Sequence, residues 1–249
     1  ILYSDINQGC KYGVSNAINW FFENETEGII LEDDCLPHLD FFYFCRDLLK
    51  IYREDKRIWS ITGQNMQNNK TYGDGSYYFS KYSHCWGWAS WRRCWEKYDR
   101  DIKSWPANKE INNLKNIFEN KKEIKFWSRI LDNLYYESRP DTWDYQWSYT
   151  CFINSGLTIV PNKNLIENIG FDQEATHTKE NFIDLSIEDF SVFSSGLIPI
   201  KHPENIIQNK KADKYTKLIC YSGINLTSIE GIKIFLKKLK YKIKGFIFI

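Results

Sequence analysis

A short apolar run that ends in a cluster of acids is the clearest pattern in this chain. Gly28 precedes the apolar run Ile29–Leu31, and the three acids Glu32–Asp34 follow it directly. An unbroken apolar run of this length is typical of a strand buried on both faces of a parallel sheet. The pattern therefore predicts an α/β fold with three carboxylates at the carboxyl end of one strand, where open α/β sheets bind ligands.

The hydrophobic pattern elsewhere predicts an alternation of helices and strands. Apolar residues recur at helical spacing in residues 11–22 and again in residues 41–52. Charged and apolar positions alternate in residues 100–139, which predicts surface helices. Short apolar runs predict further strands at residues 57–62, 77–79 and 157–160.

The three acids suggest a metal site. The side chains of Glu32, Asp33 and Asp34 repel one another unless a cation neutralises them. Hard oxygen ligands suit Mg²⁺ or Mn²⁺, and we expect such an ion to bind a phosphate-bearing substrate. The alternative is an acidic turn that caps a helix. The triplet alone does not separate these two interpretations.

The most concentrated aromatic segment surrounds Gly87, which lies between Trp86 and Trp88. A glycine at this point permits a tight bend that presents one indole to a ligand. Trp88, Trp91 and Trp95 follow helical spacing, which instead favours burial of at least two of them in a core. We expect one of Trp86 and Trp88 to line a pocket.

Asp144 lies in a second tryptophan-rich segment, which predicts the start of a helix. Trp143, Trp147 and Cys151 share one face at helical spacing, and this turns Asp144 toward a different side. The neighbouring rings would lower the local polarity and raise the pKa of the Asp144 carboxyl, as suits a proton acceptor. The alternative is an ordinary acid in the first turn of a helix, which stabilises the helix only slightly.

Composition limits the classes of function. The 33 basic and 32 acidic residues give a formal net charge of +1, whereas a general nucleic-acid binder is usually more basic. The seven cysteines lack paired Cys-x-x-Cys spacing, so we expect reduced thiols and a cytoplasmic protein. No apolar run reaches the length of a membrane-spanning helix.

The end of the chain differs in composition from the rest. Residues 229–249 mix lysines with Ile, Leu and Phe, as in a basic amphipathic helix that lies on an anionic membrane surface. The alternative is a solvated helix packed on the main domain. We therefore expect a catalytic domain over residues 1–205 and a basic amphipathic tail over residues 206–249. The tail would give peripheral contact at the inner face of a membrane.

The order of these motifs resembles the donor half of GT-A glycosyltransferases. It is most similar to bacterial nucleotide-diphospho-sugar transferases related to the Golgi enzyme that adds N-acetylglucosamine to mannose of N-glycans. The resemblance runs from about Asn7 to His177, and four motifs in register make it specific. The motifs are Leu31-Glu-Asp-Asp-Cys35, Trp86-Gly-Trp-Ala89, Trp143-Asp-Tyr-Gln-Trp147, and Asn168-Ile-Gly-Phe171 followed by Ala175-Thr-His177.

The resemblance implies a GT-A (Rossmann-like) fold with a mostly parallel sheet flanked by helices. The family's first strand would lie before Ile1, so the domain is expected to be N-terminally truncated and its nucleotide pocket incomplete. The Golgi enzyme has a basic residue near the start of its first helix that contacts phosphate. Gly13 occupies that position here, which leaves Lys11 as the substitute.

The resemblance also implies roles for the acids. Asp34 would bind Mn²⁺ or Mg²⁺ directly, while Glu32 and Asp33 would hold the ribose or water bound to the metal. Asp144 would be the catalytic base, with Asp141 as the alternative. Three further residues complete the expected site: His177 in the metal shell or donating to the diphosphate, and Trp86 and Trp88 stacking on donor or acceptor sugar.

These expectations describe a metal-dependent, inverting glycosyltransferase. It would move a sugar from a nucleotide-diphosphate donor to a hydroxyl of a glycan or lipid-linked acceptor, in surface polysaccharide biosynthesis. A sugar-nucleotide nucleotidyltransferase is one rival, although it normally has a Gly-rich loop bearing Arg and Lys. A non-catalytic carbohydrate-binding domain would explain the tryptophans but not the acids. A glycosidase with two flanking acids would need neither metal nor nucleotide.

Overall fold

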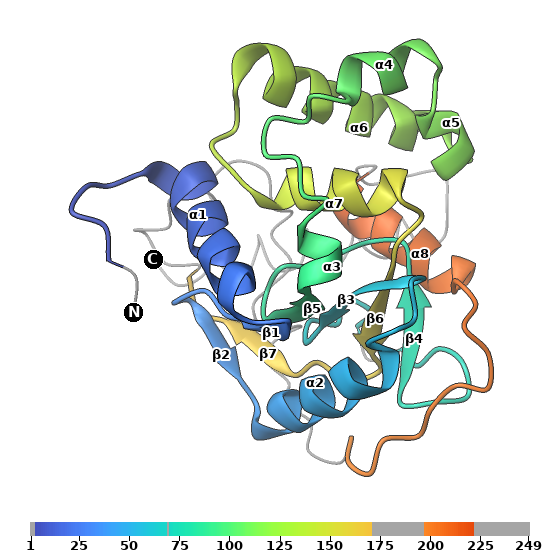
Figure 1. Cartoon of the computed structure of the whole chain (residues 1–249). Coiled ribbons are helices and arrows are strands. Elements are labelled where there is room, and N and C mark those ends of the chain that lie inside the picture. Colours follow the sequence, from blue (N-terminus) through green and yellow to red (C-terminus); the bar gives the residue numbers. More distant parts are fainter. Residues whose placement is uncertain (1–2, 69, 171–196, 222–249) are drawn as a thin grey trace, which may run out of the picture.

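A five-stranded sheet forms the centre of the computed structural model, which describes residues 3–68, 70–170 and 197–221 (Figure 1). The strands lie in the order β1 (Glu27–Ile30), β5 (Trp88–Trp91), β3 (Ile58–Thr62), β6 (Leu157–Pro161) and β4 (Tyr77–Ser80). Of these described strands, only β3 and β6 pair in parallel, and the other three pairings are antiparallel. The predicted α/β class is confirmed, but the prediction of a mostly parallel sheet is wrong.

Helices cover both faces of this sheet, which explains that error. Trp91 of β5 donates its indole N–H to the carbonyl of Leu49 on one side, at 3.2 Å. Trp88 of the same strand packs on the other side against Trp147, with ring centroids 5.3 Å apart. Antiparallel strands covered in this way are apolar on both faces, so their sequence does not differ from that of parallel strands. The covering helices are α2 (Leu39–Tyr52) below the sheet in Figure 1, and α1 (Gly9–Asn24), α3 (Arg92–Trp95) and α7 (Asp144–Ile153) above it.

Strand β1 lies at an edge of the sheet and not in its interior. Among the described residues it pairs only with β5, and all four of its residues are half-buried. Leu31, which follows it, is exposed. The prediction of a strand buried on both faces is therefore wrong for this segment. The acids do follow its carboxyl end, as predicted.

Several other predicted elements are confirmed, and two short strands were missed. The predicted helices at 11–22 and 41–52 correspond to α1 and α2, and the predicted strands to β3, β4 and β6. The helical spacing predicted from Trp88 to Trp95 is wrong, because Trp88–Trp91 is strand β5 and only Arg92–Trp95 is helical. The missed strands are β2 (Cys35–Pro37) and β7 (Ile166–Asn168), which pair antiparallel beside the main sheet.

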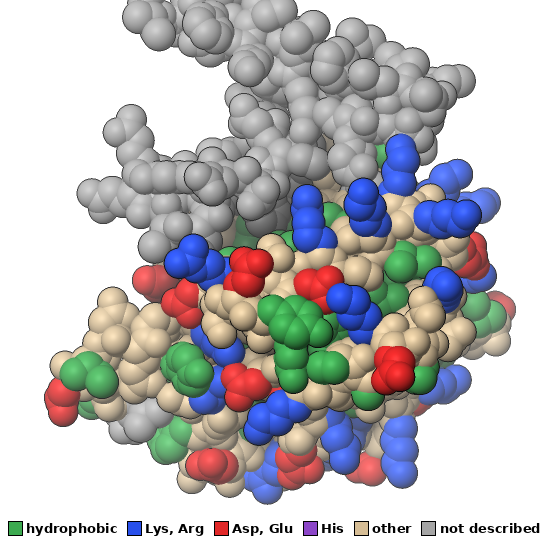
Figure 2. All heavy atoms as spheres, turned by 90° about the horizontal axis from the view of Figure 1, so that it is seen from above, with side chains coloured by type: hydrophobic (Ala, Val, Ile, Leu, Met, Phe, Trp, Pro, Cys, Tyr) green, Lys and Arg blue, Asp and Glu red, His purple; other side chains and the backbone are tan. Residues whose placement is uncertain are grey.

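Residues 105–137 form a helical lobe above the sheet, with its own apolar core (Figure 1). Trp105, Trp127 and Leu131 are almost fully buried in it. Seen from above, the molecule presents basic and acidic side chains interleaved around a small apolar patch (Figure 2). The lobe consists of α4 (Trp105–Glu110), α5 (Leu114–Ile117), α6 (Lys121–Asp132) and the π-helical turn η1 (Asn133–Glu137).

Two elements within the predicted tail, residues 206–249, lie in the described part of the chain and pack on the domain. Helix α8 (Lys210–Thr216) buries Ala212 against β4, and the π-helical segment η3 (Lys217–Tyr221) follows it. Gln208 also bridges to Phe79 of β4. The predicted basic helix of residues 229–249 lies outside the described residues.

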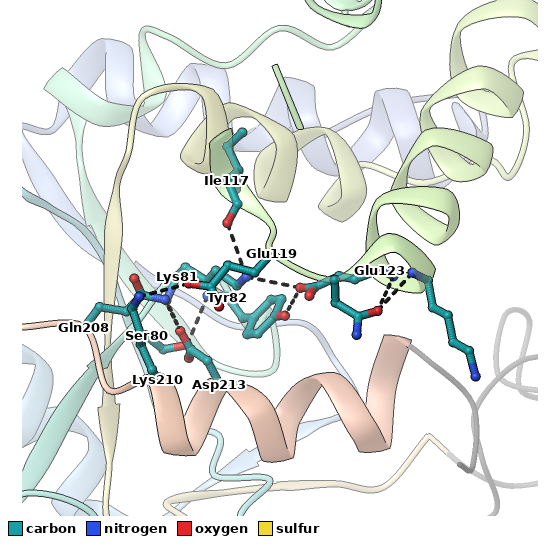
Figure 3. Close-up of polar contacts among 11 residues, drawn as sticks. Ser80, Lys81, Tyr82, Ile117, Glu119, Glu123, Gln208, Lys210 and Asp213 are labelled. Carbon is teal, nitrogen blue, oxygen red and sulfur yellow. Dashed lines mark hydrogen bonds and ion pairs between the residues drawn. The ribbon is translucent and has the colours of Figure 1, made fainter. Parts of the chain in front are cut away.

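A buried polar cluster joins the sheet, the helical lobe and α8 (Figure 3). The Lys81 ammonium lies 3.2 Å from a Glu123 carboxylate oxygen of α6, and the Tyr82 hydroxyl donates to the same oxygen. Asp213 of α8 accepts hydrogen bonds from the Ser80 hydroxyl at 2.6 Å and from the Lys81 backbone N–H at 3.3 Å. Adjacent residues at the end of β4 thus hold two helices from different parts of the chain.

All seven cysteines lie in the described part of the chain and are free thiols, as predicted. Among the described residues, no helix combines the length and the apolar character needed to cross a membrane.

Candidate active site

The acids 32–34 form a tight turn between β1 and β2. The backbone N–H of Cys35 donates to the carbonyl of Glu32 at 3.1 Å, which closes the turn with Asp33 and Asp34 at its centre. Asp33 is exposed, while Glu32 and Asp34 are half-buried. We call this segment, Glu32–Asp34, the acidic turn.

The end of β7 supports the acidic turn. The backbone N–H of Ile169 donates to the carbonyl of Asp34 at 2.8 Å. Gly170 packs so closely on Asp34 that a Cβ at position 170 would lie 2.5 Å from Oδ2. A residue with a side chain would therefore displace either this backbone or the Asp34 carboxylate. The Asn-Ile-Gly motif thus lies beside the acidic turn, and His177, a few residues later, lies outside the described residues.

The start of α7 meets the acidic turn from the other side. Trp143 directly precedes the helix, and its indole N–H donates to Glu32 Oε1 at 2.9 Å. Asp144, the first residue of α7, is half-buried, and its carboxylate accepts a hydrogen bond from the Thr142 hydroxyl. Trp143, Trp147 and Cys151 are all buried in the core of the sheet, so the predicted shared face of these residues is confirmed.

The carboxylates of this site influence one another. The pKa of Glu32 is raised from its ordinary value to about 7, chiefly by burial and also by the negative charges of Asp34, Asp144 and Asp33. The hydrogen bond from Trp143 opposes this shift because it stabilises the carboxylate form. The structure therefore brings the acidic turn and Asp144 into one electrostatic neighbourhood that favours protons or cations.

Cys10 belongs to the same neighbourhood, which sequence analysis missed. Burial raises the pKa of its thiol, and the charges of Glu32, Asp144 and Asp141 raise it further. A backbone hydrogen bond joins the thiol to Trp143. The signal for Cys10 was its place directly after the Asn-Gln-Gly loop, but nothing in the local pattern showed which way the thiol points.

Asp141, the alternative base, caps helix α1. Its carboxylate accepts hydrogen bonds from the backbone N–H groups of Cys10 at 2.9 Å and Lys11 at 3.0 Å. Gly9 has a φ of +71°, and a Cβ there would lie 2.5 Å from Asp141 Oδ2. An acid at the start of a helix satisfies free N–H groups and favours the helix dipole. These bonds give Asp141 a structural role.

Lys11 is directed to an acid outside the predicted site. Its ammonium lies 2.9 Å from Asp101 Oδ1, and its side chain is largely buried. The predicted contact of Lys11 with phosphate would require this ion pair to open.

Trp86 and Trp88 are both buried, with 8% and 1% of their surface exposed. Trp88 stacks on Trp143 with ring centroids 5.6 Å apart and planes 22° from parallel. The expectation that one of these indoles lines a pocket fails for Trp88, because β5 directs it into the core beneath α7. Trp86 likewise has little surface left for a sugar ring.

A groove of about 910 Å³ leads to the acidic turn along the open edge of β1. Apolar side chains of α1, among them Val14 and Phe21, face Ile29 and Ile30 across it. Glu32 and Asp33 line its acidic end, together with Asp141. The groove is therefore mainly apolar and becomes acidic at the turn.

The donor set at the turn suits a hard cation. Carboxylate oxygens are the ligands that Mg²⁺ and Mn²⁺ prefer, and Mg²⁺ is usually bound through one or two carboxylates, with waters and substrate phosphates completing the shell. Among the described residues, no group of three or more Asp, Glu, His or Cys side chains is arranged to hold a metal ion. Asp34, with Glu32 and Asp33 beside it, fits a site in which one or two carboxylates hold the ion and waters and phosphates complete its shell.

A comparison of the sequence with models of known protein families gives no match, and a comparison with curated proteins finds no similar sequence.

Proposed function

We propose that this protein is a metal-dependent, inverting glycosyltransferase whose active site is the acidic turn together with Asp144. One observation carries this proposal: the Trp143–Glu32 hydrogen bond joins the acidic turn to the start of α7. A carboxylate group that attracts cations and a separate carboxylate for proton transfer are the two parts that such a reaction needs. They come from distant parts of the sequence.

Each acid has a distinct role in the proposed reaction. The Asp34 carboxylate binds Mn²⁺ or Mg²⁺, and Glu32 and Asp33 bind the ribose or metal-bound water. When bound, the ion supplies positive charge that stabilises the departing diphosphate. Asp144 accepts the proton of the attacking hydroxyl on the opposite face of the sugar. The Thr142 hydroxyl fixes the orientation of its carboxylate.

The proposed substrates are those that the resemblance to nucleotide-diphospho-sugar transferases implies. The donor is a nucleotide-diphospho-sugar, and the acceptor is a hydroxyl of a glycan or of a lipid-linked sugar in surface polysaccharide synthesis. The reaction would take place in the cytoplasm, with peripheral contact at the inner face of a membrane.

A thermal-shift screen of nucleotide-diphospho-sugars with and without Mn²⁺ tests the proposal. We expect at least one of them to raise the unfolding temperature only when Mn²⁺ is present, because binding to the folded state alone stabilises it. Sugar-dependent stabilisation that needs neither nucleotide nor Mn²⁺ would favour a carbohydrate-binding module. If no compound in the screen stabilises the folded protein with Mn²⁺, the proposal is wrong.

Two variants separate the proposed roles. Asp34→Ala should abolish Mn²⁺-dependent nucleotide binding and leave the fold intact. Asp144→Asn should retain that binding and lower turnover by roughly 10²–10⁴-fold, the usual contribution of a general base. Asp47→Asn, at an exposed ion pair on α2, is the matched control and should change neither. Transfer at the native rate by Asp144→Asn would show that another group is the base.

A further inference from the structure

Trp143 makes polar contacts to three parts of the molecule while its ring is buried. Its indole N–H donates to Glu32, its carbonyl accepts from the Tyr98 hydroxyl at 3.1 Å, and a backbone hydrogen bond joins it to Cys10. The side chain is only 1% exposed and is stacked on Trp88. Packing therefore leaves the indole little freedom to turn away from the acidic turn.

Two neighbouring tryptophans of this cluster, Trp88 and Trp147, lack such a contact. Trp88 and Trp147 pack against each other and near Trp143, yet the indole N–H of each is buried without a hydrogen-bond partner in the described structure. Burial of an indole N–H costs free energy unless the N–H donates a hydrogen bond. Of these three rings, only that of Trp143 directs its N–H to a group of the candidate active site.

We infer that Trp143 is a positioning residue, which sets the distance and orientation of the acidic turn relative to Asp144. This inference rests on the proposed function. Asp144 follows Trp143 in the chain, so a rigid ring bonded to Glu32 fixes the turn against the first residue of α7. Groups that orient the acids around a metal commonly change its affinity about 10–100-fold when they are removed.

The decisive experiment compares Trp143→Phe with Trp147→Phe. Each variant removes the same part of an indole from one tryptophan cluster, but only the first removes a hydrogen bond to the acidic turn. With Mn²⁺ alone as the probe, titrated by electron paramagnetic resonance, we expect Trp143→Phe to bind about tenfold more weakly. Trp147→Phe should stay within about twofold of the native affinity. Circular dichroism confirms that both variants are folded.

A double variant tests whether Trp143 acts through Glu32. We expect Glu32→Ala to weaken Mn²⁺ binding, and Trp143→Phe to cause little additional loss in that background, because the indole N–H then has no carboxylate to hold and coupled residues are not additive. Full additivity, or equal losses in Trp143→Phe and Trp147→Phe, would overturn the positioning role. If the native protein binds no Mn²⁺, the proposed function itself fails.

Nuclear magnetic resonance provides a test that needs no metal. The indole ¹⁵N–¹H signal that disappears in Trp143→Phe identifies Trp143, and this signal should move in Glu32→Ala, which removes the hydrogen-bond acceptor. The signals of Trp88 and Trp147 should move much less. A Trp143 signal that stays in place would contradict the hydrogen bond and, with it, the positioning role, whether or not the protein transfers sugar.

Discussion

The folded state destabilises the ionised form of the Glu32 carboxyl. Burial, together with the charges of neighbouring acids, raises its pKa from 4.5 to about 7. When a carboxyl has a higher pKa folded than unfolded, the folded state binds more protons over the interval between the two values. The resulting stability is complete below pH 4.5 and is lost as the pH rises through 7. A shift of this size corresponds to about 3 kcal/mol.

We therefore predict that Glu32→Gln stabilises the metal-free protein at pH 8. Gln keeps an oxygen that accepts the Trp143 hydrogen bond but carries no charge to desolvate. Urea unfolding in the presence of a chelator should give a stability difference between variant and native protein that grows from pH 4.5 to pH 8, by up to about 3 kcal/mol.

The test must use the difference in unfolding free energy between the variant and the native protein, because the titration of His84 changes stability with pH in the opposite direction. Burial lowers the pKa of His84 to about 4, so the folded state loses stability as the pH falls through the interval below 6.5. That effect is common to both proteins and cancels. A stability difference that does not depend on pH would contradict the raised pKa of Glu32.

Single residues also show which features of the candidate site can be predicted from the sequence alone. The acid pattern after β1 and the Trp-Asp motif singled out two segments that a hydrogen bond joins in the structure, because charge and apolar spacing are local features. The hydrogen bond from Trp143 to Glu32 and the inclusion of Cys10 depend on how distant segments pack. The capping of α1 by Asp141 is of the same kind, since the acid and the helix are far apart in the chain.

At the scale of elements, the sequence predicted most helices and strands but not their directions. The spacing of apolar residues and the length of a segment identify a helix or strand, whereas the direction of a strand depends on connections across the whole sheet. The segment Trp88–Trp91 illustrates a second limit. Every position of β5 is buried, so the alternation that normally marks a strand is absent, and tryptophans three residues apart suggested a helix instead.

The polar cluster at the end of β4 links elements in a way that mutation can test. Lys81→Met leaves the Glu123 carboxylate, which is 3% exposed, without its cation. Removing one partner of a buried pair costs about 3 kcal/mol or more, because the remaining charge stays desolvated. We predict a loss of that size in urea unfolding, and partial recovery when Glu123→Gln is added.

The ion pair between Lys210 and Glu119 is a control in the same region (Figure 3). Both side chains are strongly exposed, and such pairs contribute little to stability. Lys210→Met should leave the urea midpoint unchanged. If the Lys81 and Lys210 variants lose equal stability, the Lys81–Glu123 pair is not a buried anchor between the sheet and the lobe.

At the scale of the whole molecule, α7 belongs to two hydrophobic cores at once. Trp147 and Cys151 pack into the core of the sheet, while Tyr149 and Phe152 pack into that of the helical lobe. The sequence showed one buried face of this helix and not the second, because the lobe that covers it is a separate set of residues. The proposed catalytic residue Asp144 thus begins a helix that both parts hold.

This sharing predicts that the lobe does not unfold independently. Opening α6 alone would expose the lobe face of α7 and break the Lys81–Glu123 pair. In native-state hydrogen exchange, we expect the slowest amides of α6 and β6 to exchange with the same free energy and the same denaturant dependence. Phe152→Leu should lower the exchange free energies of α6 and β6 equally, because the Phe152 ring packs on Trp127 with centroids 4.8 Å apart. Smaller values for α6 alone would show a lobe that opens by itself, and the position of Asp144 would then depend on the sheet core alone.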